Sequence, residues 1–424
     1  MRVPVDGGRL RADIESNAEF GAVEYEDPEK RGRTNRTGSE ANRRARDRLV
    51  ERMETAGLDV SVDAVGNVAG TWIADTADPT LEPVASGSHL DSVPEGGIFD
   101  GPLGVYAALE AVRAIQDADL EPRRPVTVVC FTEEEGATYG DGLVGSTAAV
   151  GERSVAETLA TTNDEGETLG EALSRIGYRG DGLIDPATWN AFYELHVEQD
   201  TKLESRGAEV GVVTTITGIT HCETTILGEA NHAGATEMSD RTDALAAASE
   251  LVLDVERAAT DVTETTSPSA VGTVGSLSVS PNATNVVPGR VEARLDVRDV
   301  DIESIETIVG AVRDSLGRLE RERGVETAFE RSLDVEPTPM SDRLRRTAHD
   351  AATATDRVAV DLHSGAAHDA MRVARATDAS LLFAPSRNGI SHSPLEWTDW
   401  ADCATATAVL AGAIAHISGA KLQG

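Results

Sequence analysis

Apolar and polar positions alternate along the first half of the chain in a pattern that predicts strands and helices in turn. Residues 40–56 carry apolar side chains at helical spacing and stop at Gly57, as an amphipathic helix would. The further elements expected in this half are short strands in 58–65 and 67–73, buried strands in 83–92 and 125–136, a helix over 102–115, and a strand in 192–199. This order predicts an α/β sheet with its chemistry at strand ends, and residues 154–190 are expected to be connecting structure.

The pattern changes after about residue 210. Two β-rich runs surround Gly218, and they are followed by a long helix (241–259), two strands (270–279 and 290–298), a helix (301–323) and a strand (326–333). The resulting β-β-α-β-β-α-β order suits a compact ferredoxin-like insert. From about residue 331 the chain returns to helix and strand.

We therefore expect two domains, as the length of 424 residues also suggests. Residues 1–210 and 331–424 form a discontinuous catalytic domain, and residues 211–330 form a smaller inserted domain. The last helix, near 404–419, is interrupted by His416 and by Thr and Ser. It is expected to be too short and too polar for a membrane span and to pack inside the fold.

The strongly acidic net charge limits the kinds of partner that the protein can bind. Asp and Glu number 73 against 38 Lys and Arg, a formal net charge of -35, and the only lysines are Lys30, Lys202 and Lys421. A heavily acidic, lysine-poor surface is typical of proteins from halophiles, although an ordinary acidic cytosolic protein is the alternative. Nucleic acid and anionic membranes, which both need a basic surface, are disfavoured as partners.

The cysteines and the N-terminus indicate a soluble, cytoplasmic protein. Cys130, Cys222 and Cys403 lie far apart and form no CxxC pair, which argues against a disulfide framework or a thiolate metal site. The first residues lack the apolar core of a signal peptide.

Imidazoles and carboxylates gather where the predicted strands end. They occur in GSHLDS, GGIFDGPLG, FTEEEG, ELHVEQ, NHAGAT, HSGAAHDAM and NGISHSP. A two-ion hydrolytic site needs ligands of these types, one carboxylate that bridges both ions, and another that stays free to take a proton. A single loop histidine is more often structural, so it is the ordered set that indicates metal chemistry.

Taken in order, these motifs and NATNVVPG resemble the M20-type metallo-amidohydrolases, over nearly the whole chain. The nearest branch is the hydantoinase/carbamoylase group, which includes N-carbamoyl-L-amino acid hydrolase, β-ureidopropionase and allantoate amidohydrolase. The resemblance implies a zinc-peptidase-like α/β catalytic domain with an inserted ferredoxin-like α+β lid and dimerisation domain. It also implies a homodimer and two divalent ions, for which ligand type alone leaves Zn, Mn, Co and Ni open.

The same resemblance assigns roles at the metal centre. The ligands it implies are His89, Asp100 as the bridge, Glu135, His196 and His392. Glu134 would be the general base, and Asp91 would orient the His89 imidazole. Glu133 is expected to face solvent or the backbone. The implied reaction is attack by metal-bound hydroxide on a ureido or amide carbonyl.

Substrate contacts follow from the resemblance as well. His232 would polarise the carbonyl, reaching the site from the partner subunit, and Arg298 would grip a substrate carboxylate. The other implied contacts are Gln199, Asn285, His368 and His221. Arg298 has a second interpretation, as a strand-end arginine paired with Asp296 or Asp299, and His221 is open between pocket wall and surface.

Departures from the family pattern leave the exact substrate open. Ala367 replaces a glycine, and His221 stands where allantoate enzymes tend to carry arginine and carbamoylases tryptophan. The leading expectation is an amidohydrolase that cleaves N-carbamoyl-L-amino acids to amino acid, CO2 and NH3. Allantoate or ureidoglycolate amidohydrolase is the alternative, followed by a dipeptidase or aminoacylase. A non-catalytic metal-binding protein is disfavoured because all the implied ligands and Glu134 are present.

Overall fold

The structure is a computed structural model that describes residues 2–422, and it divides into two compact units. Unit 1 runs through Thr214, from Met340 to Leu362 and from Ala366 onward. Unit 2 comprises Thr215–Pro339 with His363–Gly365. Each unit has its own cluster of buried apolar side chains.

The framework of unit 1 is a nine-stranded sheet in the order β1-β2-β5-β3-β6-β16-β7-β14, with β15 also paired to β7. Strand β14 and the last two residues of β7 and of β15 fall within the residues of unit 2. The strands are β1 (Asp59–Val62), β2 (Val68–Trp72), β3 (Val84–His89), β5 (Val126–Phe131), β6 (Ala191–Val197), β7 (Val210–Ile216), β14 (Thr338–Pro339), β15 (Ala359–Ser364) and β16 (Ala379–Ala384). The central strands β5, β3, β6 and β16 are parallel and wholly buried, which explains their continuous apolar runs. A short pair, β4 (Leu120–Glu121) and β17 (Lys421–Leu422), lies apart from this sheet.

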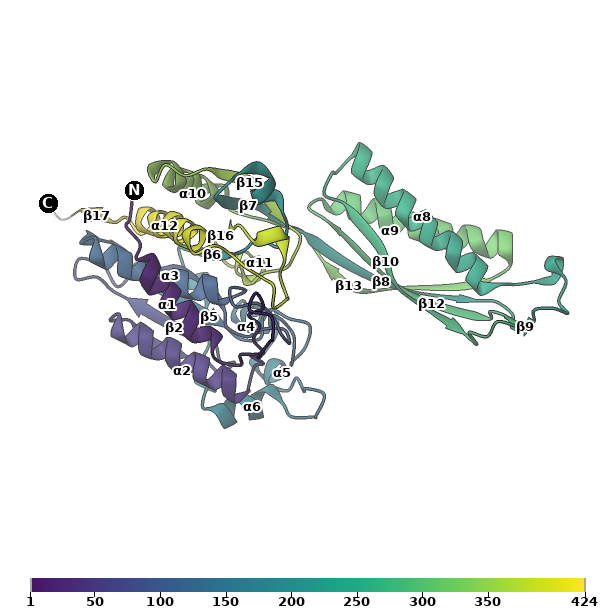
Figure 1. Cartoon of the computed structure of the whole chain (residues 1–424), viewed down its shortest axis with the longest axis horizontal. Helices are drawn as coiled ribbons and strands as arrows, with labels where there is room; N and C mark the ends of the chain where they lie inside the picture. Colours follow the sequence, from purple (N-terminus) through teal and green to yellow (C-terminus); the bar gives the residue numbers. More distant parts are fainter. Residues whose placement is uncertain (1, 423–424) are drawn as a thin grey trace. The chain divides into compact units, whose positions relative to one another are not determined.

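Helices cover both faces of the large sheet (Figure 1). The helices of unit 1 are α1 (Gly7–Ala18), α2 (Glu40–Thr55), α3 (Pro102–Asp117), α4 (Val144–Ala149), α5 (Val155–Leu159), α6 (Leu169–Ile176), α7 (Lys202–Arg206), α10 (Asp342–Ala354), α11 (Asp369–Val373) and α12 (Trp400–Ile417). On β6, the Tyr193 hydroxyl donates to the Leu344 carbonyl of α10, whereas the next residue, Glu194, accepts from Ala370 of α11. Because successive strand residues point to opposite faces, α10 and α11 lie on opposite sides of the sheet.

The C-terminal helix α12 is longer and more apolar than the sequence analysis expected. Its length and composition would be sufficient to cross a membrane, so the expectation that this segment is too short and too polar was wrong. However, 61% of it is buried inside the fold, where it packs against α3 and α10. It is a core helix of unit 1, as its buried face of small and apolar residues allows.

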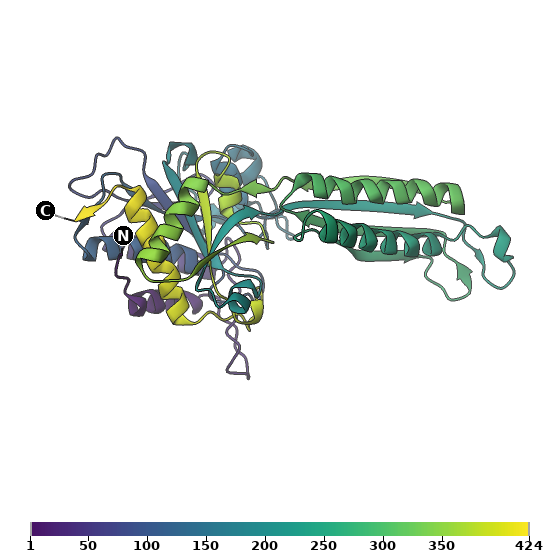
Figure 2. The same ribbon diagram turned by 90° about the horizontal axis from the view of Figure 1, so that it is seen from above.

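Unit 2 is a four-stranded antiparallel sheet in the order β10-β12-β8-β13, with two helices on one face (Figure 2). Its elements are β8 (Gly218–Leu227), α8 (Ala244–Thr265), β10 (Val271–Ser280), β12 (Arg290–Asp299), α9 (Ile302–Arg323) and β13 (Glu326–Val335), with a ribbon of β9 (Asn231–His232) and β11 (Val286–Val287). This is the β-α-β-β-α-β arrangement of a ferredoxin-like fold, and the fold class expected from the sequence is confirmed.

The first β-rich run, before Gly218, does not belong to this sheet. It forms β7, which pairs with β16 and β14 in the large sheet of unit 1. The expected order placed two strands before the first helix of the insert, and this was wrong because only one strand of the four-stranded sheet, β8, precedes α8. The chain leaves unit 1 through β7 and returns through β14, and these two strands are antiparallel neighbours with Thr338 opposite Ile216.

Candidate metal centre and substrate groups

The metal-type side chains of unit 1 stand at one edge of the large sheet. His89 is the last residue of β3, Glu134 and Glu135 follow the end of β5, and His196 is near the end of β6. Since β3 runs parallel to β5 and to β6, their carboxyl ends meet at the same edge. Open α/β sheets place their ligands at this edge.

Asp100 reaches this edge because of the glycine that follows it. Gly101 precedes the proline that starts α3, and its φ of 80° is a conformation that favours glycine. A Cβ at Gly101 would lie 2.6 Å from Cε1 of His89. The glycine therefore lets the Asp100 turn lie directly against the His89 imidazole.

One oxygen of Asp100 faces two buried imidazoles. Asp100 Oδ1 is 3.1 Å from Nε2 of His196 and 3.7 Å from Nε2 of His89, and the two Nε2 atoms are 3.5 Å apart. The Nδ1 atoms of these rings lie 3.2 Å and 3.3 Å from the carbonyls of Asp91 and Val197. With Nδ1 facing a carbonyl, each ring keeps Nε2, on the side of Asp100, as the nitrogen that can bind a metal ion.

The other oxygen of Asp100 faces a second group. Oδ2 is 3.4 Å from Nε2 of His392, which in turn is 3.2 Å from Oε2 of Glu135. His392 lies in a loop with a left-handed φ of 51°. Asp100 thus stands between two sets of candidate ligands, His89–Asp100–His196 and Asp100–Glu135–His392.

These donors fit a pair of divalent cations. Both sets offer lone pairs of imidazole nitrogen and carboxylate oxygen, the ligand types that zinc and similar ions take, around one shared carboxylate. Burial favours neutral Asp100, but His196 and His89 outweigh it and hold the Asp100 pKa below its usual range. Burial likewise opposes the charge on His196, yet Asp100 raises the pKa of His196 to about 9. The sequence analysis predicted all five of these residues as metal ligands, and that role remains a prediction.

Glu134 lies beside this cluster without belonging to either set. Its Oε2 is 3.7 Å from Nε2 of His89. Burial, followed by the charges of Asp369 and Glu135, raises the pKa of Glu134 well above its ordinary value. A carboxylate that holds a proton readily and stays free of the candidate ligand sets has the properties of a general base.

Several residues hold the candidate ligands from behind. The Asp91 carboxylate is 3.7 Å from Nδ1 of His89 and accepts the backbone N–H of Glu135 at 3.1 Å. The buried Arg33 guanidinium donates to the carbonyls of Leu90, Asp91, Gly97 and Asp100, which ties both ligand loops together. The Glu396 carboxylate accepts the N–H groups of Phe99 and Asp100.

Sequence reasoning anticipated Asp91 but missed Arg33 and Glu396. Arg33 acts through backbone carbonyls, and Glu396 is distant in sequence from the loop it caps, so no local spacing marks either of them. Glu133, expected to face solvent or the backbone, is fully buried and turned toward backbone N–H groups.

His368 and Gln199 lie near the candidate ligands in unit 1. The His368 ring centroid is 4.5 Å from that of His196, and both ring nitrogens of this buried residue lack a hydrogen-bond partner among the described residues. Gln199 Nε2 is 3.4 Å from Oγ of Ser391, which also donates to Asp100 Oδ2. A buried imidazole with unsatisfied nitrogens calls for a further polar group, such as a substrate atom or water.

In unit 2, His232 and Asn285 come together on the β9–β11 ribbon. Ala233 donates its N–H to the Asn285 carbonyl, and His232 pairs with Val286. His232 is exposed, and its Nδ1 accepts the N–H groups of Gly234 and Ala235 at 3.0 and 3.1 Å. An accepting Nδ1 places the proton on Nε2, so the ring presents an N–H donor to its surroundings.

Arg298 and His221 both contact Asp296 in unit 2. Arg298 makes a two-pronged pair with Asp296, with Nε–Oδ1 and Nη2–Oδ2 both 2.8 Å, and donates from Nη1 to the Gly365 carbonyl. His221 Nε2 lies 3.1 Å from Asp296 Oδ2. The second interpretation of Arg298, a pair with Asp296, is therefore what the structure contains. Asp296 also fixes the plane of the guanidinium.

Comparison with known proteins places these residues in a family. Residues 85–416 match the model of peptidase family M20/M25/M40. The chain is 40% identical over 372 residues to N-carbamoyl-L-amino acid amidohydrolase of Geobacillus stearothermophilus, covering 87% of this chain and 89% of the relative. It is 34% identical over 376 residues to ureidoglycolate hydrolase of Arabidopsis thaliana, covering 86% and 78%.

A solved structure agrees along the whole chain. An amidase of the hydantoinase/carbamoylase family from Burkholderia multivorans superposes with a TM-score of 0.90 at 34% identity, covering 98% of each chain. The resemblance drawn from the motifs is confirmed. The chain belongs to the M20/M25/M40 family of metal-dependent hydrolases, within its amidohydrolases that act on C–N bonds other than peptide bonds.

Proposed function

We propose that the protein is a two-metal amidohydrolase that converts N-carbamoyl-L-amino acids to the amino acid, CO2 and NH3. The observation that carries the proposal is Asp100, whose two oxygens face separate sets of candidate ligands beside the free carboxylate of Glu134. Relatives with this activity in their names, at up to 40% identity, support the choice of substrate class.

His89 and His196 would hold one ion and Glu135 and His392 the other, with Asp100 shared. Bound divalent ions of this kind supply Lewis-acid polarisation of a carbonyl and lower the pKa of water. Metal analysis of the purified protein will identify the native ion among Zn, Mn, Co and Ni.

Glu134 is the proton carrier in this proposal. It takes a proton from the attacking water as the C–O bond forms at the ureido carbon, and delivers it to the nitrogen of the C–N bond that breaks. Loss of CO2 from the resulting carbamate frees the second nitrogen. Asp91 keeps the His89 ring oriented throughout.

Unit 2 is proposed to supply the substrate contacts. The exposed Nε2–H of His232 would donate to the carbonyl oxygen as negative charge develops there, and Asn285 holds the same ribbon. Arg298, fixed by Asp296, would bind the substrate carboxylate with its remaining N–H groups. Gln199 and His368 would contact the ureido group from unit 1.

A second candidate is an allantoate or ureidoglycolate amidohydrolase. The ureidoglycolate hydrolase relative, at 34% identity, favours it. The position that tends to be arginine in allantoate enzymes is His221, which is hydrogen-bonded to Asp296. His221 is therefore a candidate for the residue that separates the two substrate classes.

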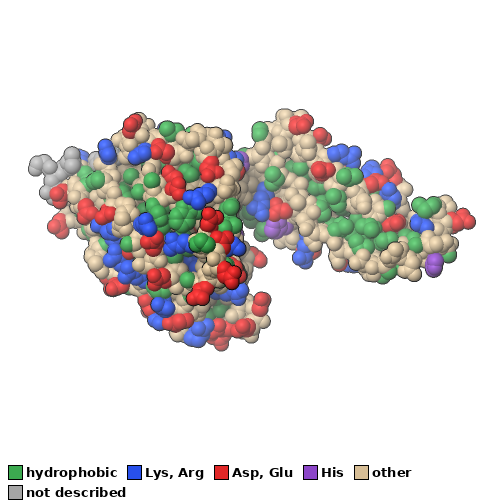
Figure 3. Space-filling view, in the orientation of Figure 1, with side chains coloured by type: hydrophobic (Ala, Val, Ile, Leu, Met, Phe, Trp, Pro, Cys, Tyr) green, Lys and Arg blue, Asp and Glu red, His purple; other side chains and the backbone are tan. Residues whose placement is uncertain are grey.

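We further propose a homodimer formed through strand β10. β10 is an end strand of its sheet, and Val271–Ser280 contains no charged residue, whereas the opposite end strand β13 carries Glu326, Glu330, Arg331 and Asp334. Leu277 and Val271 of β10 are 42% and 50% exposed, and Figure 3 shows hydrophobic side chains spread over unit 2. An uncharged edge strand favours pairing with a second copy.

The acidic surface supports one more proposal, that the protein works in the cytoplasm of a salt-adapted cell. A net charge of -35 keeps a chain soluble when counterions are concentrated. Thermal stability that rises steeply between dilute buffer and molar KCl is the expected behaviour.

Ammonia release tests the proposed function. The protein, purified in molar KCl and loaded with Mn or Zn, is offered N-carbamoyl-L-amino acids, β-ureidopropionate, allantoate, ureidoglycolate and dipeptides. Turnover of a carbamoyl compound that chelators abolish, and that falls by about 100-fold or more in Glu134→Gln, is expected. Turnover of allantoate or ureidoglycolate alone would instead favour the second candidate.

A further inference from the structure

The first glutamate of the Glu133–Glu135 run turns back onto its own loop. Glu133 is fully buried, and its Oε1 accepts the backbone N–H groups of Thr138 at 2.6 Å and Tyr139 at 2.7 Å. Its φ of 55° lies in the left-handed region, which a non-glycine residue adopts only where the surroundings compensate. One carboxylate oxygen therefore closes the loop from residue 133 to residue 139.

The same loop carries the two residues that the proposed function uses for proton transfer and metal binding. Glu134 and Glu135 follow Glu133 directly, and the loop is tied on one side by Leu143 N–H to the Glu134 carbonyl and Val144 N–H to the Glu133 carbonyl. On the other side the Glu135 N–H donates to Asp91. The far half of the loop, from Ala137 to Tyr139, is the part that Glu133 holds.

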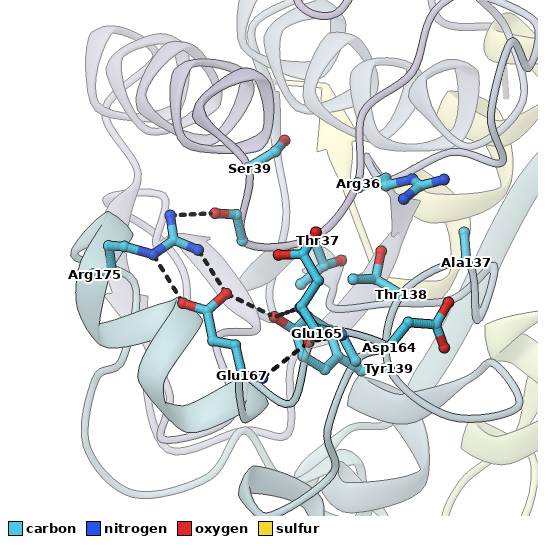
Figure 4. Close-up of a pocket in the computed structure, with 12 residues that line it drawn as sticks. Arg36, Thr37, Ser39, Ala137, Thr138, Tyr139, Asp164, Glu165, Glu167 and Arg175 are labelled. Atoms are coloured by element: carbon cyan, nitrogen blue, oxygen red, sulfur yellow. Dashed lines mark hydrogen bonds and ion pairs between the residues drawn. The ribbon is translucent and has the colours of Figure 1, made fainter.

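Part of that far half borders a pocket: Ala137 and Thr138 are partly exposed, whereas the Tyr139 side chain is buried in the core. The pocket has a volume of about 290 Å³. Figure 4 shows Ala137, Thr138 and Tyr139 among the residues that line it. In the same lining, Arg175 pairs with Glu167 and donates to the Gly38 carbonyl. Because Ala137 and Thr138 face this open space, the backbone hydrogen bonds that Glu133 accepts supply order that a packed interior would otherwise give at this point of the loop.

We propose that Glu133 is a positioning residue, which aims Glu134 and Glu135 at the metal centre by clamping the N–H groups of Thr138 and Tyr139. This inference rests on the proposed function for the roles of Glu134 and Glu135. Groups that hold metal ligands from behind typically affect metal affinity or activity by about 10–100-fold when they are removed.

Three variants test the inference. Glu133→Ala removes both hydrogen bonds, Glu133→Gln keeps the shape with a weaker uncharged acceptor, and Glu165→Gln changes an exposed carboxylate on the rim of the same pocket. In Glu133→Ala, kcat is expected to fall by about 100-fold with KM little changed, and the weaker-binding ion should lose about 10-fold in affinity. Glu133→Gln should lie between Glu133→Ala and the wild type, and Glu165→Gln should match the wild type.

Two readouts need no substrate and separate the inference from the proposed function. Calorimetric titration with Mn2+ or Zn2+ reports the affinity of each ion, and hydrogen exchange reports the amides of Thr138 and Tyr139. If the wild type hydrolyses no ureido compound, the proposed function fails, while weaker ion binding and faster exchange in the Glu133 variants still support the clamp. The inference is overturned if Glu133→Ala folds and binds both ions as tightly as the wild type although its Thr138 and Tyr139 amides exchange faster. If Glu133→Ala does not fold, the same result in Glu133→Gln overturns it. Unchanged exchange in those variants overturns it as well.

Discussion

At the scale of single residues, the close approach of Gly101 to His89 constrains the candidate centre directly. A side chain at position 101 meets Cε1 of His89 at 2.6 Å and its Nδ1 at 2.7 Å, and φ there is +80°. The His89 ring cannot yield without losing its approach to Asp100.

Gly101→Ala is therefore expected to abolish metal binding by the His89–Asp100–His196 set, lower activity by about 100-fold or more, and destabilise unit 1 by roughly 1–3 kcal/mol. The matched control is Gly310→Ala, because Gly310 lies within α9 with open space around its Cβ position. Alanine there should stabilise unit 2 by about 0.5–1 kcal/mol. Metal analysis with thermal unfolding checks both, and a Gly101→Ala protein that binds two ions would contradict the account.

The candidate ligands were predictable from sequence because each stands in a short motif that resembles the family pattern, and three of them, His89, Glu135 and His196, stand at or just after strand ends. The parallel strands β3, β5 and β6 bring those three together, whereas Asp100 and His392 reach them through the turn at Gly101 and through a loop. Arg33 and Glu396 were not predictable, because their contacts are with backbone atoms far away in sequence. Glu133 was ambiguous, since three consecutive glutamates give no sign of which one is turned inward.

At the scale of elements, periodicity gave the boundaries of some long elements closely, although the helix expected over 241–259 is α8, which runs from Ala244 to Thr265. The helix expected over 301–323 is α9, Ile302–Arg323, and the strand expected in 290–298 is β12, Arg290–Asp299. The membership of β7 did not follow, because an apolar run before Gly218 has the same pattern whether it pairs in one sheet or the other. The short helices α5 and α6 were missed in a polar stretch, where Ser154 and Thr168 form capping boxes.

Helices α8 and α9 are joined by ion pairs that should make unit 2 sensitive to acid. Glu250 pairs with Arg318 and Arg323, and Asp254 pairs with Arg318. The hydrogen bonds with Arg323 and Arg318 lower the pKa of Glu250. Burial opposes the charge of Asp254, but Ser315 and Arg318 outweigh it and lower the Asp254 pKa.

Since the folded-state pKa values of both carboxyls are depressed, the stability they contribute is present above their ordinary values and is lost as pH falls through the lowered ones. The double variant Glu250→Gln/Asp254→Asn is expected to melt below the wild type at pH 7 and close to it near pH 3. Glu256→Gln, an exposed acid on α8, is the control. The measurement is circular dichroism of the helices, and an equal deficit at both pH values would contradict the prediction.

At the scale of the whole molecule, the spectroscopic probes are divided between the units. Every tryptophan and every tyrosine lies in unit 1, whereas unit 2 contains Phe329 as its one large aromatic residue. Tryptophan fluorescence therefore reports unfolding of unit 1 alone, and it can be compared with circular dichroism to see whether the two cores melt together.

Association through β10 is the second expectation at this scale. Leu277→Glu places a charge on the uncharged edge strand and is expected to weaken self-association by about 10-fold or more, as measured by sedimentation velocity in molar KCl. Ile73→Glu, at a residue of unit 1 that is 50% exposed, serves as the control. A wild-type protein that sediments as a monomer at all concentrations would rule out the dimer.

The adjacency of β7 and β14 has a consequence for how this chain can be cut and rejoined. Because Ile216 and Thr338 face each other on neighbouring antiparallel strands, the ends left by deleting unit 2 are already placed for a tight hairpin. Joining residue 217 to residue 337 through a short Asn-Gly turn should yield a minimal protein that keeps its tryptophan emission and binds two ions, yet turns over no substrate. Gain or loss of unit 2 in a gene would then require one in-frame event at a single junction, with the metal centre left intact.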